Sequence, residues 1–236
     1  MPLLALLLFP YGLVFAANEP PIGPNNWGAT GLMETPTARV LEYGKFRVGV
    51  GYVDPYLYYY GAVSPLQGLE IDGHITEVLG TEVGTDNPTW KGYGNFKDKY
   101  VGLKYQFLRE GKYWPALALG IMDPHGTRVF AGQYLVASKK IFPFDFTIGL
   151  GNGRFGKAPL PRSDEAIKVE LIQNPREWWN DAQVFGGVEF HPASWLSFMV
   201  EYNPIKYEAQ TRDPARNRYF KDPVPSNINV GMRFKP

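Results

Sequence analysis

From about Lys45 to the end of the chain, apolar and polar side chains alternate, which is the periodicity of β-strands. The stretch Leu69–Thr76 shows it most clearly, because apolar residues or glycine occupy its odd positions and polar residues occupy its even positions. Successive side chains of a strand point to opposite faces of the sheet, so such a stretch has one apolar face and one polar face. Repetition of the pattern along the chain predicts an all-β protein.

Ten strands are predicted from this alternation, and their connections differ in length. Short turns follow the second, fourth, sixth and eighth strands, whereas long links follow the third, seventh and ninth; the first link is short and the fifth is intermediate. Outer-membrane barrels combine short periplasmic turns with long outer loops. The ten predicted ranges are 45–52, 56–63, 69–78, 99–108, 114–122, 130–139, 144–151, 182–190, 195–203 and 227–234.

The pattern therefore predicts a transmembrane antiparallel up-and-down β-barrel, closed, with 10–12 strands and both termini in the periplasm. A soluble β-sandwich or lipocalin-like barrel is the alternative, since its strands also alternate. Two features favour the membrane barrel. Aromatic residues gather at strand ends, and small residues thin out the polar faces: Gly49, Gly51, Gly102, Ala116, Ala118 and Gly120.

The N-terminus carries features of a targeting signal. A short apolar core at 3–15 ends in Val14-Phe15-Ala16, which provides a small-x-small cleavage site. Residues 1–16 are predicted to be a signal peptide, with a buried strand or helix as the alternative. No cysteine follows the apolar core, which argues against a lipoprotein. Residues 17–44 form a leader rich in Pro and Gly that supplies either extra strands or a plug, and residues 45–236 form the barrel.

Composition excludes several classes of function. The net charge of +1 gives no indication of a nucleic-acid partner. The absence of cysteine rules out disulfides and thiolate metal sites, and the three histidines lack the spacing of metal ligands. The segment Gly151–Gly156 matches a dinucleotide fingerprint, but the prolines after it forbid the helix that the motif needs. No nucleophile stands beside a base, so neither an enzyme nor a cofactor is predicted.

Charged residues lie on the polar faces of several predicted strands. Charges in a narrow lumen must be paired, so these residues are predicted to form a charge network inside the barrel. Structural pairing that fills the barrel is favoured, and a gate or ion-selective constriction is the alternative. The candidates are Arg47, Glu70, Asp72, His74, Lys104, Glu189, Glu201 and Arg233.

Trp178 and Trp179 are adjacent in the long link at 152–181, beside Arg176 and Glu177. A tryptophan pair with charged neighbours can stack on the rings of sugars. It can equally anchor a protein at the membrane interface, and this interpretation is favoured.

An ordered set of short motifs resembles the YjbH family. The resemblance implies an outer-membrane β-barrel protein associated with exopolysaccharide production or export, and it supplies no catalytic residues. Longer members of the family look like two barrel units in one chain, and this chain corresponds to one such unit. The motifs are Thr30–Arg39, Tyr43–Gly49, Asp98–Lys104, Glu110–Gly120, Gln133–Lys140, Phe144–Gly151, Phe185–Phe190, Val200–Asn203 and Asn227–Gly231.

These observations predict an outer-membrane barrel that takes part in exopolysaccharide secretion or surface retention. A small barrel leaves little room between its inward side chains, so an accessory or docking role is favoured over a polymer pore. The expected partners are outer-membrane lipids, polysaccharide, and periplasmic or lipoprotein components of an export system. A small-solute, porin-like channel is the alternative function.

Overall fold

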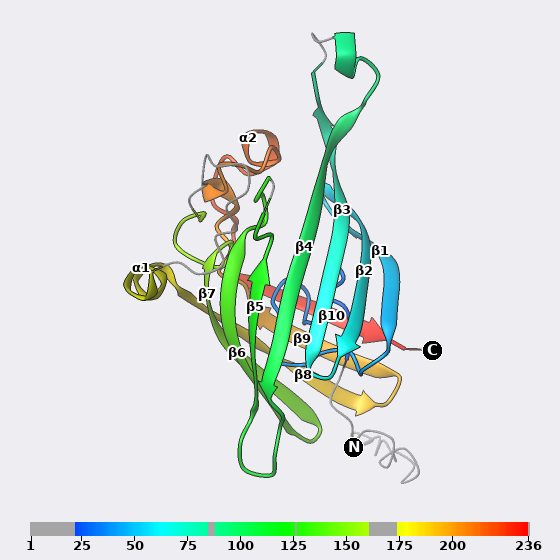
Figure 1. Cartoon of the computed structure of the whole chain (residues 1–236), viewed down its shortest axis with the longest axis vertical. Coiled ribbons are helices and arrows are strands. Elements are labelled where there is room, and N and C mark those ends of the chain that lie inside the picture. The colour runs from blue at the N-terminus through cyan, green and yellow to red at the C-terminus, as the bar shows by residue number, and fades with distance from the viewer. Residues whose placement is uncertain (1–21, 85–87, 126, 161–173, 236) are drawn as a thin grey trace, which may run out of the picture.

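The computed structural model describes residues 22–84, 88–125, 127–160 and 174–235, so the predicted signal peptide lies outside the described residues. The chain forms one ten-stranded antiparallel sheet in which every strand pairs with its neighbours in sequence (Figure 1). The predicted number and order of strands are confirmed. The strands are β1 (Phe46–Val53), β2 (Tyr56–Leu66), β3 (Leu69–Glu82), β4 (Asn95–Leu108), β5 (Ala116–Met122), β6 (Gly132–Ile141), β7 (Phe144–Gly153), β8 (Gln183–Ala193), β9 (Leu196–Tyr202) and β10 (Ile228–Phe234).

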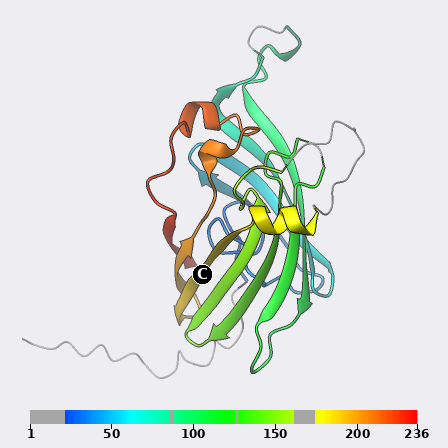
Figure 2. The same ribbon diagram turned by 90° about the vertical axis from the view of Figure 1, so that its left-hand side faces the viewer.

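The short helices all lie in links that follow odd-numbered strands. In an antiparallel meander these links share one end of the sheet, and the tight turns share the other. Figures 1 and 2 show the helical links at the upper end and the tight turns at the lower end. The helices are η2 (Pro88–Trp90), α1 (Pro175–Asp181), η3 (Tyr207–Ala209) and α2 (Arg216–Tyr219). No helix among the described residues is both long and apolar enough to cross a membrane.

Burial shows which face of the sheet is inside. The side chains of Val48 and Val230, at the two edges, are each 75% exposed, whereas Glu70 on β3 and Glu201 on β9 are 0% exposed. Apolar residues therefore point outward and charged residues point inward. A soluble barrel has the opposite arrangement, so the observed polarity is the one expected for a sheet surrounded by lipid.

We call residues 22–44 the inner segment. It lies inside the curve of the sheet up to Leu41, and its last three residues are exposed (Figure 2). The segment contains two isolated bridges, Pro24–Thr30 and Gly31–Pro36, and no strand. It supplies buried apolar side chains, among them Trp27 and Leu32. The described part of the leader thus adds no strand to the sheet, and its role as a plug stays a prediction.

The two edge strands, β1 and β10, are not hydrogen-bonded to each other. Closure of the sheet therefore stays a prediction. A cavity of about 680 Å³ lies between the edges, lined by Val50 of β1, by Met232 and Phe234 of β10, and by the inner segment. The inner segment is thus the floor of the gap that separates the edges.

Candidate functional site: the polar interior and the inner segment

Glu70 holds the inner segment from β3. Its carboxylate accepts hydrogen bonds from the backbone N–H and the hydroxyl of Thr30, at 2.8 and 2.5 Å, and from the backbone N–H of Leu41 at 2.8 Å. Lys104 lies opposite Glu70 on β4, and its Nζ is 3.3 Å from Glu70 Oε1 and 2.6 Å from the carbonyl oxygen of Thr30. Each of the two buried charges therefore has an ion-pair partner and hydrogen bonds to the inner segment, which offset part of the cost of its burial.

Glu201 provides a second carboxylate anchor, on β9. It accepts hydrogen bonds from three successive backbone N–H groups, those of Met33 (3.0 Å), Glu34 (2.8 Å) and Thr35 (3.2 Å). The hydroxyl of Thr35 and the side-chain amide of Asn229 on β10 also donate to it, each at 2.9 Å. Consecutive N–H groups that converge on one anion form a backbone nest, which fixes the turn at 33–35 against the sheet.

Arg233 binds the inner segment from the edge strand β10. Its guanidinium donates to the carbonyl oxygens of Pro24, Gly31 and Leu32 at 3.0, 2.8 and 3.2 Å, and pairs with Glu189 on β8 at 2.8 Å. The planar fork of arginine can reach several acceptors at once. One side chain therefore joins the inner segment to the sheet.

Arg47 has the corresponding position on the other edge strand, β1. Its Nη1 donates to the carbonyl oxygen of Gly28 at 3.0 Å. Arg47 and Arg233 thus attach the same segment to both edges, so the segment bridges the gap that no strand pairing closes.

Asp72 and His74 are buried on β3 but do not join the ion pairs around Glu70. His74 Nδ1 lies 2.8 Å from the hydroxyl of Thr76, and its ring stacks on Tyr100 with centroids 4.2 Å apart. Asp72 packs beside Gly102, where a Cβ atom would lie 2.7 Å from Asp72 Oδ1. The predicted residues therefore do not form one continuous charge network. Arg47, Glu70, Lys104, Glu201 and Arg233 bond the inner segment, and Glu189 pairs with Arg233.

A further anchor involves Arg39, which the strand pattern does not mark because it precedes the first strand. Its guanidinium pairs with Asp145 of β7 at 2.8 Å and with Glu110 of the β4–β5 turn at 2.6 Å. Glu110 is also 3.0 Å from Lys139 of β6. An arginine in a Pro- and Gly-rich leader, next to a predicted barrel with acidic inward positions, is the signal that could have indicated this contact.

Arg154 also escapes the pattern, because it follows the end of β7. Its side chain is fully buried, and its nitrogens have no hydrogen-bond partner among the described residues. Its guanidinium carbon lies 4.5 Å from the ring centroid of Phe130, 5.7 Å from that of Tyr207 and 5.8 Å from that of Trp27. Through cation–π contacts, Arg154 therefore joins Trp27 of the inner segment to Tyr207 in the link that follows β9.

Glu34 lies in the inner segment, where its Oε1 accepts a hydrogen bond from the side chain of Asn26 at 2.5 Å. Burial raises the pKa of Glu34 to about 7, although the charge of Arg154 acts in the opposite direction. A carboxyl group that is removed from water favours its neutral form. The inner segment therefore contains a group that titrates near neutral pH.

Trp178 and Trp179 lie on α1, at the end of the sheet that carries the long links (Figure 1). Their ring centroids are 6.2 Å apart, and Trp179 is 67% exposed. They form a separate surface feature.

The interior is built to hold a segment of chain. Its anchors are carboxylates and cations already bound to that segment, and no group of metal-ligating side chains occurs among the described residues. The geometry defines a class: an all-β protein whose antiparallel sheet has an apolar outer face and a charged inner face filled by the chain's own N-terminal segment.

Sequence comparison specifies the family. Residues 24–236 match the model of the YjbH family, described as exopolysaccharide biosynthesis protein YbjH, so the chain belongs to this family and the predicted resemblance is confirmed. The uncharacterized lipoprotein YjbH of Escherichia coli strain K12 is 34% identical over 241 residues, which cover 95% of this chain and 33% of the relative. The chain thus spans about a third of the length of the curated relative that it matches.

Proposed function

We propose that this protein is an outer-membrane β-barrel that takes part in exopolysaccharide secretion or surface retention as a non-catalytic accessory or docking component. The observation that carries the proposal is the filled interior: anchors on β3, β4, β7, β9 and β10 hold the inner segment where a pore would have to be. A barrel with an occupied lumen can display loops and bind partners, but it conducts polymer poorly.

The membrane location is supported by the outer face of the sheet. Exposed apolar side chains cover it, and Val48, Ile148 and Val230 are among the most exposed. The Escherichia coli relative is described as a lipoprotein, which supports an envelope location for this chain. In hydrocarbon, unpaired backbone groups are costly, so we propose that β1 and β10 pair in the membrane and place both termini in the periplasm.

The expected partners are outer-membrane lipids, polysaccharide and periplasmic or lipoprotein components of an export system. The pair Trp178 and Trp179, of which Trp179 is 67% exposed, is the proposed anchor of the loop end at the membrane interface. Contact with polysaccharide is the alternative role of the pair, since tryptophan rings present flat apolar faces to sugars.

A gene deletion tests the pathway. We expect the deletion strain to release or retain less exopolysaccharide than the parent, and a plasmid copy to restore the amount. Normal exopolysaccharide in the deletion strain, measured as surface and medium sugar, would contradict the proposal.

Conductance in planar bilayers tests the filled interior. The purified full chain should show no steady openings, because the anchors of the inner segment are buried and ion-paired. Steady single-channel openings would instead favour the second candidate, a small-solute channel.

A further inference from the structure

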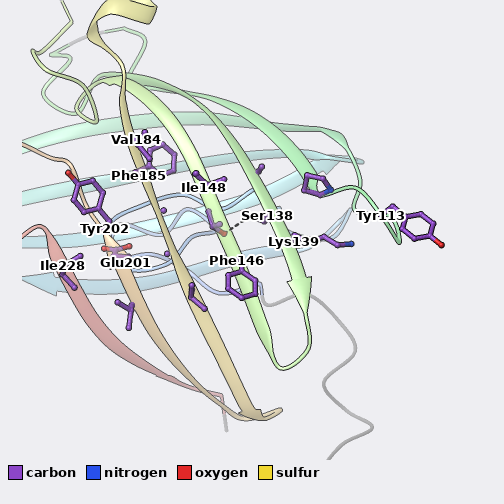
Figure 3. A pocket seen from close by; sticks show the side chains of 17 residues that line it. Tyr113, Ser138, Lys139, Phe146, Ile148, Val184, Phe185, Glu201, Tyr202 and Ile228 are labelled. Carbon is purple, nitrogen blue, oxygen red and sulfur yellow. Dashed lines mark hydrogen bonds between the residues drawn. The ribbon is translucent and has the colours of Figure 1, made fainter.

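A groove of about 780 Å³ lies on the outward face of the sheet, over strands β6 to β9 (Figure 3). The strand register explains its position. Ala137, Ile148, Gly186 and Tyr202 are successive cross-strand partners, so they form one row across the outer face. The row has a large side chain on each side of Gly186 and none at Gly186. The backbone at Gly186 therefore forms the floor of the groove.

The glycine is required by the close approach of the strands. A Cβ atom on Gly186 would collide with the carbonyl oxygen of Thr147, and one on Gly187 would collide with the carbonyl oxygen of Val200 and meet Leu32 of the inner segment. No side chain can therefore fill the groove from its own floor. The walls are apolar, and Figure 3 shows Ile148, Val184 and Phe146 among the lining residues.

One end of the groove differs from the rest. It reaches Tyr113, which is 80% exposed, and Lys139, near the tight-turn end of the sheet. The ammonium group of Lys112 lies over the ring of Tyr113 at 5.2 Å. Glu110 and Asp145 balance the charges of Lys139 and Arg39, so the charge of Lys112 makes this end net positive. An apolar groove that ends beside cations and an aromatic ring matches the acyl chain and the anionic head group of a lipid.

We propose that this groove is a binding site for one phospholipid, with an acyl chain lying over Gly186 and the phosphate near Lys139 and Lys112. The inference rests on the proposed membrane location and adds a defined lipid site to it. The occupant follows from the match between the apolar floor and walls, which suit an acyl chain, and the cationic end, which suits a phosphate.

Native mass spectrometry of the purified full chain tests the site. The protein is reconstituted in vesicles of phosphatidylethanolamine and phosphatidylglycerol, extracted in mild detergent and measured. We expect one retained phospholipid per chain. Ala137→Phe places a ring in the groove and should reduce the retained fraction by about tenfold, which corresponds to about 1.4 kcal/mol.

Gly61→Phe is the matched control. Gly61 lies on β2, outside the groove, and a Cβ atom there meets its neighbours only at ordinary distances of 3.6 and 3.9 Å. The control should retain lipid as the wild type does. Val184→Phe fills the groove from the opposite wall and replaces Ala137→Phe if that variant does not fold. Lys139→Gln should lower the preference for phosphatidylglycerol.

Two results would overturn the proposal: no retained phospholipid on the wild-type chain, or equal loss from the groove variants and from Gly61→Phe. Neither result bears on the exopolysaccharide pathway, which the deletion strain tests separately. Conversely, a deletion strain with normal exopolysaccharide leaves lipid retention by the purified chain unaffected.

Discussion

Buried carboxylates are the residues that determine how the interior is filled. Glu201 accepts hydrogen bonds from three backbone N–H groups of the inner segment, and Glu70 accepts two in addition to its ion pair with Lys104. Backbone N–H groups exist in any sequence, so the segment needs no special motif to bind them. The strand alternation therefore predicts the carboxylates that hold the inner segment, but no sequence pattern predicts the backbone groups that they bind.

Glu34 makes the inner segment sensitive to pH. Its pKa is about 7 in the folded chain, above the 4.5 of an unperturbed glutamate, so the folded chain binds more protons between these two pH values. The stability contributed by protonation is complete below pH 4.5 and is lost as the pH rises through about 7. We expect the wild type to lose its folded gel mobility at a lower temperature at pH 8 than at pH 5.

Glu34→Gln keeps the shape and removes the charge, so this pH difference should shrink. Glu42→Gln is the control, because Glu42 belongs to the same segment and is exposed. A Glu34→Gln variant with the full pH dependence of the wild type would show that other groups are responsible.

The residues that the sequence could indicate are those on strands. The alternation placed Glu70, Lys104 and Glu201 on polar faces, and all three are buried in the interior. Arg39 and Arg154 lie before the first strand and after β7, where no periodicity assigns a face. Their roles depend on the three-dimensional path of irregular chain, and a strand pattern contains no information about it.

The strands and the inner segment differ in how they are specified. Each strand is fixed by alternation and by its neighbour in sequence, and all ten were predictable for that reason. The inner segment has no period of its own and is held by side chains from distant strands, such as Gln106 and Ser138, which bond the backbone of Ala38 at 2.7 and 2.9 Å.

Glu201→Ala tests how firmly the inner segment is held. Loss of a charged acceptor costs about 1.5–3 kcal/mol. Hydrogen exchange of the amides at Met33–Thr35 should therefore rise on the order of 10–100-fold, because about 1.4 kcal/mol corresponds to a factor of ten. Glu177→Gln, on α1, is an exposed control that should leave this exchange unchanged. Unchanged protection in Glu201→Ala would mean that the nest is not the anchor.

At the scale of the whole molecule, the pairing of β1 with β10 can be tested by cross-linking. The natural chain has no cysteine, so a thiol cross-linker can react only with the cysteines that are introduced. With Val48→Cys on β1 and Val230→Cys on β10, a short thiol cross-linker should give an intrachain product in membranes if the edges pair. Val48→Cys with Val184→Cys on β8 is the control that should not react.

Interchain dimers from the edge pair, or no product in membranes, would contradict closure. The position of the inner segment favours closure. Arg47 and Arg233 already hold the segment from both edges, which keeps the two strands close to the same floor.

The anchoring of the inner segment also has a consequence for the order of folding. Residues 33–35 are synthesised early, but Glu201 follows them by 166 to 168 residues, and Arg233 follows Pro24 by 209. Contacts so distant in sequence form slowly, because a long loop must close first. The inner segment therefore completes its contacts with the sheet only after β10, the last strand, has formed.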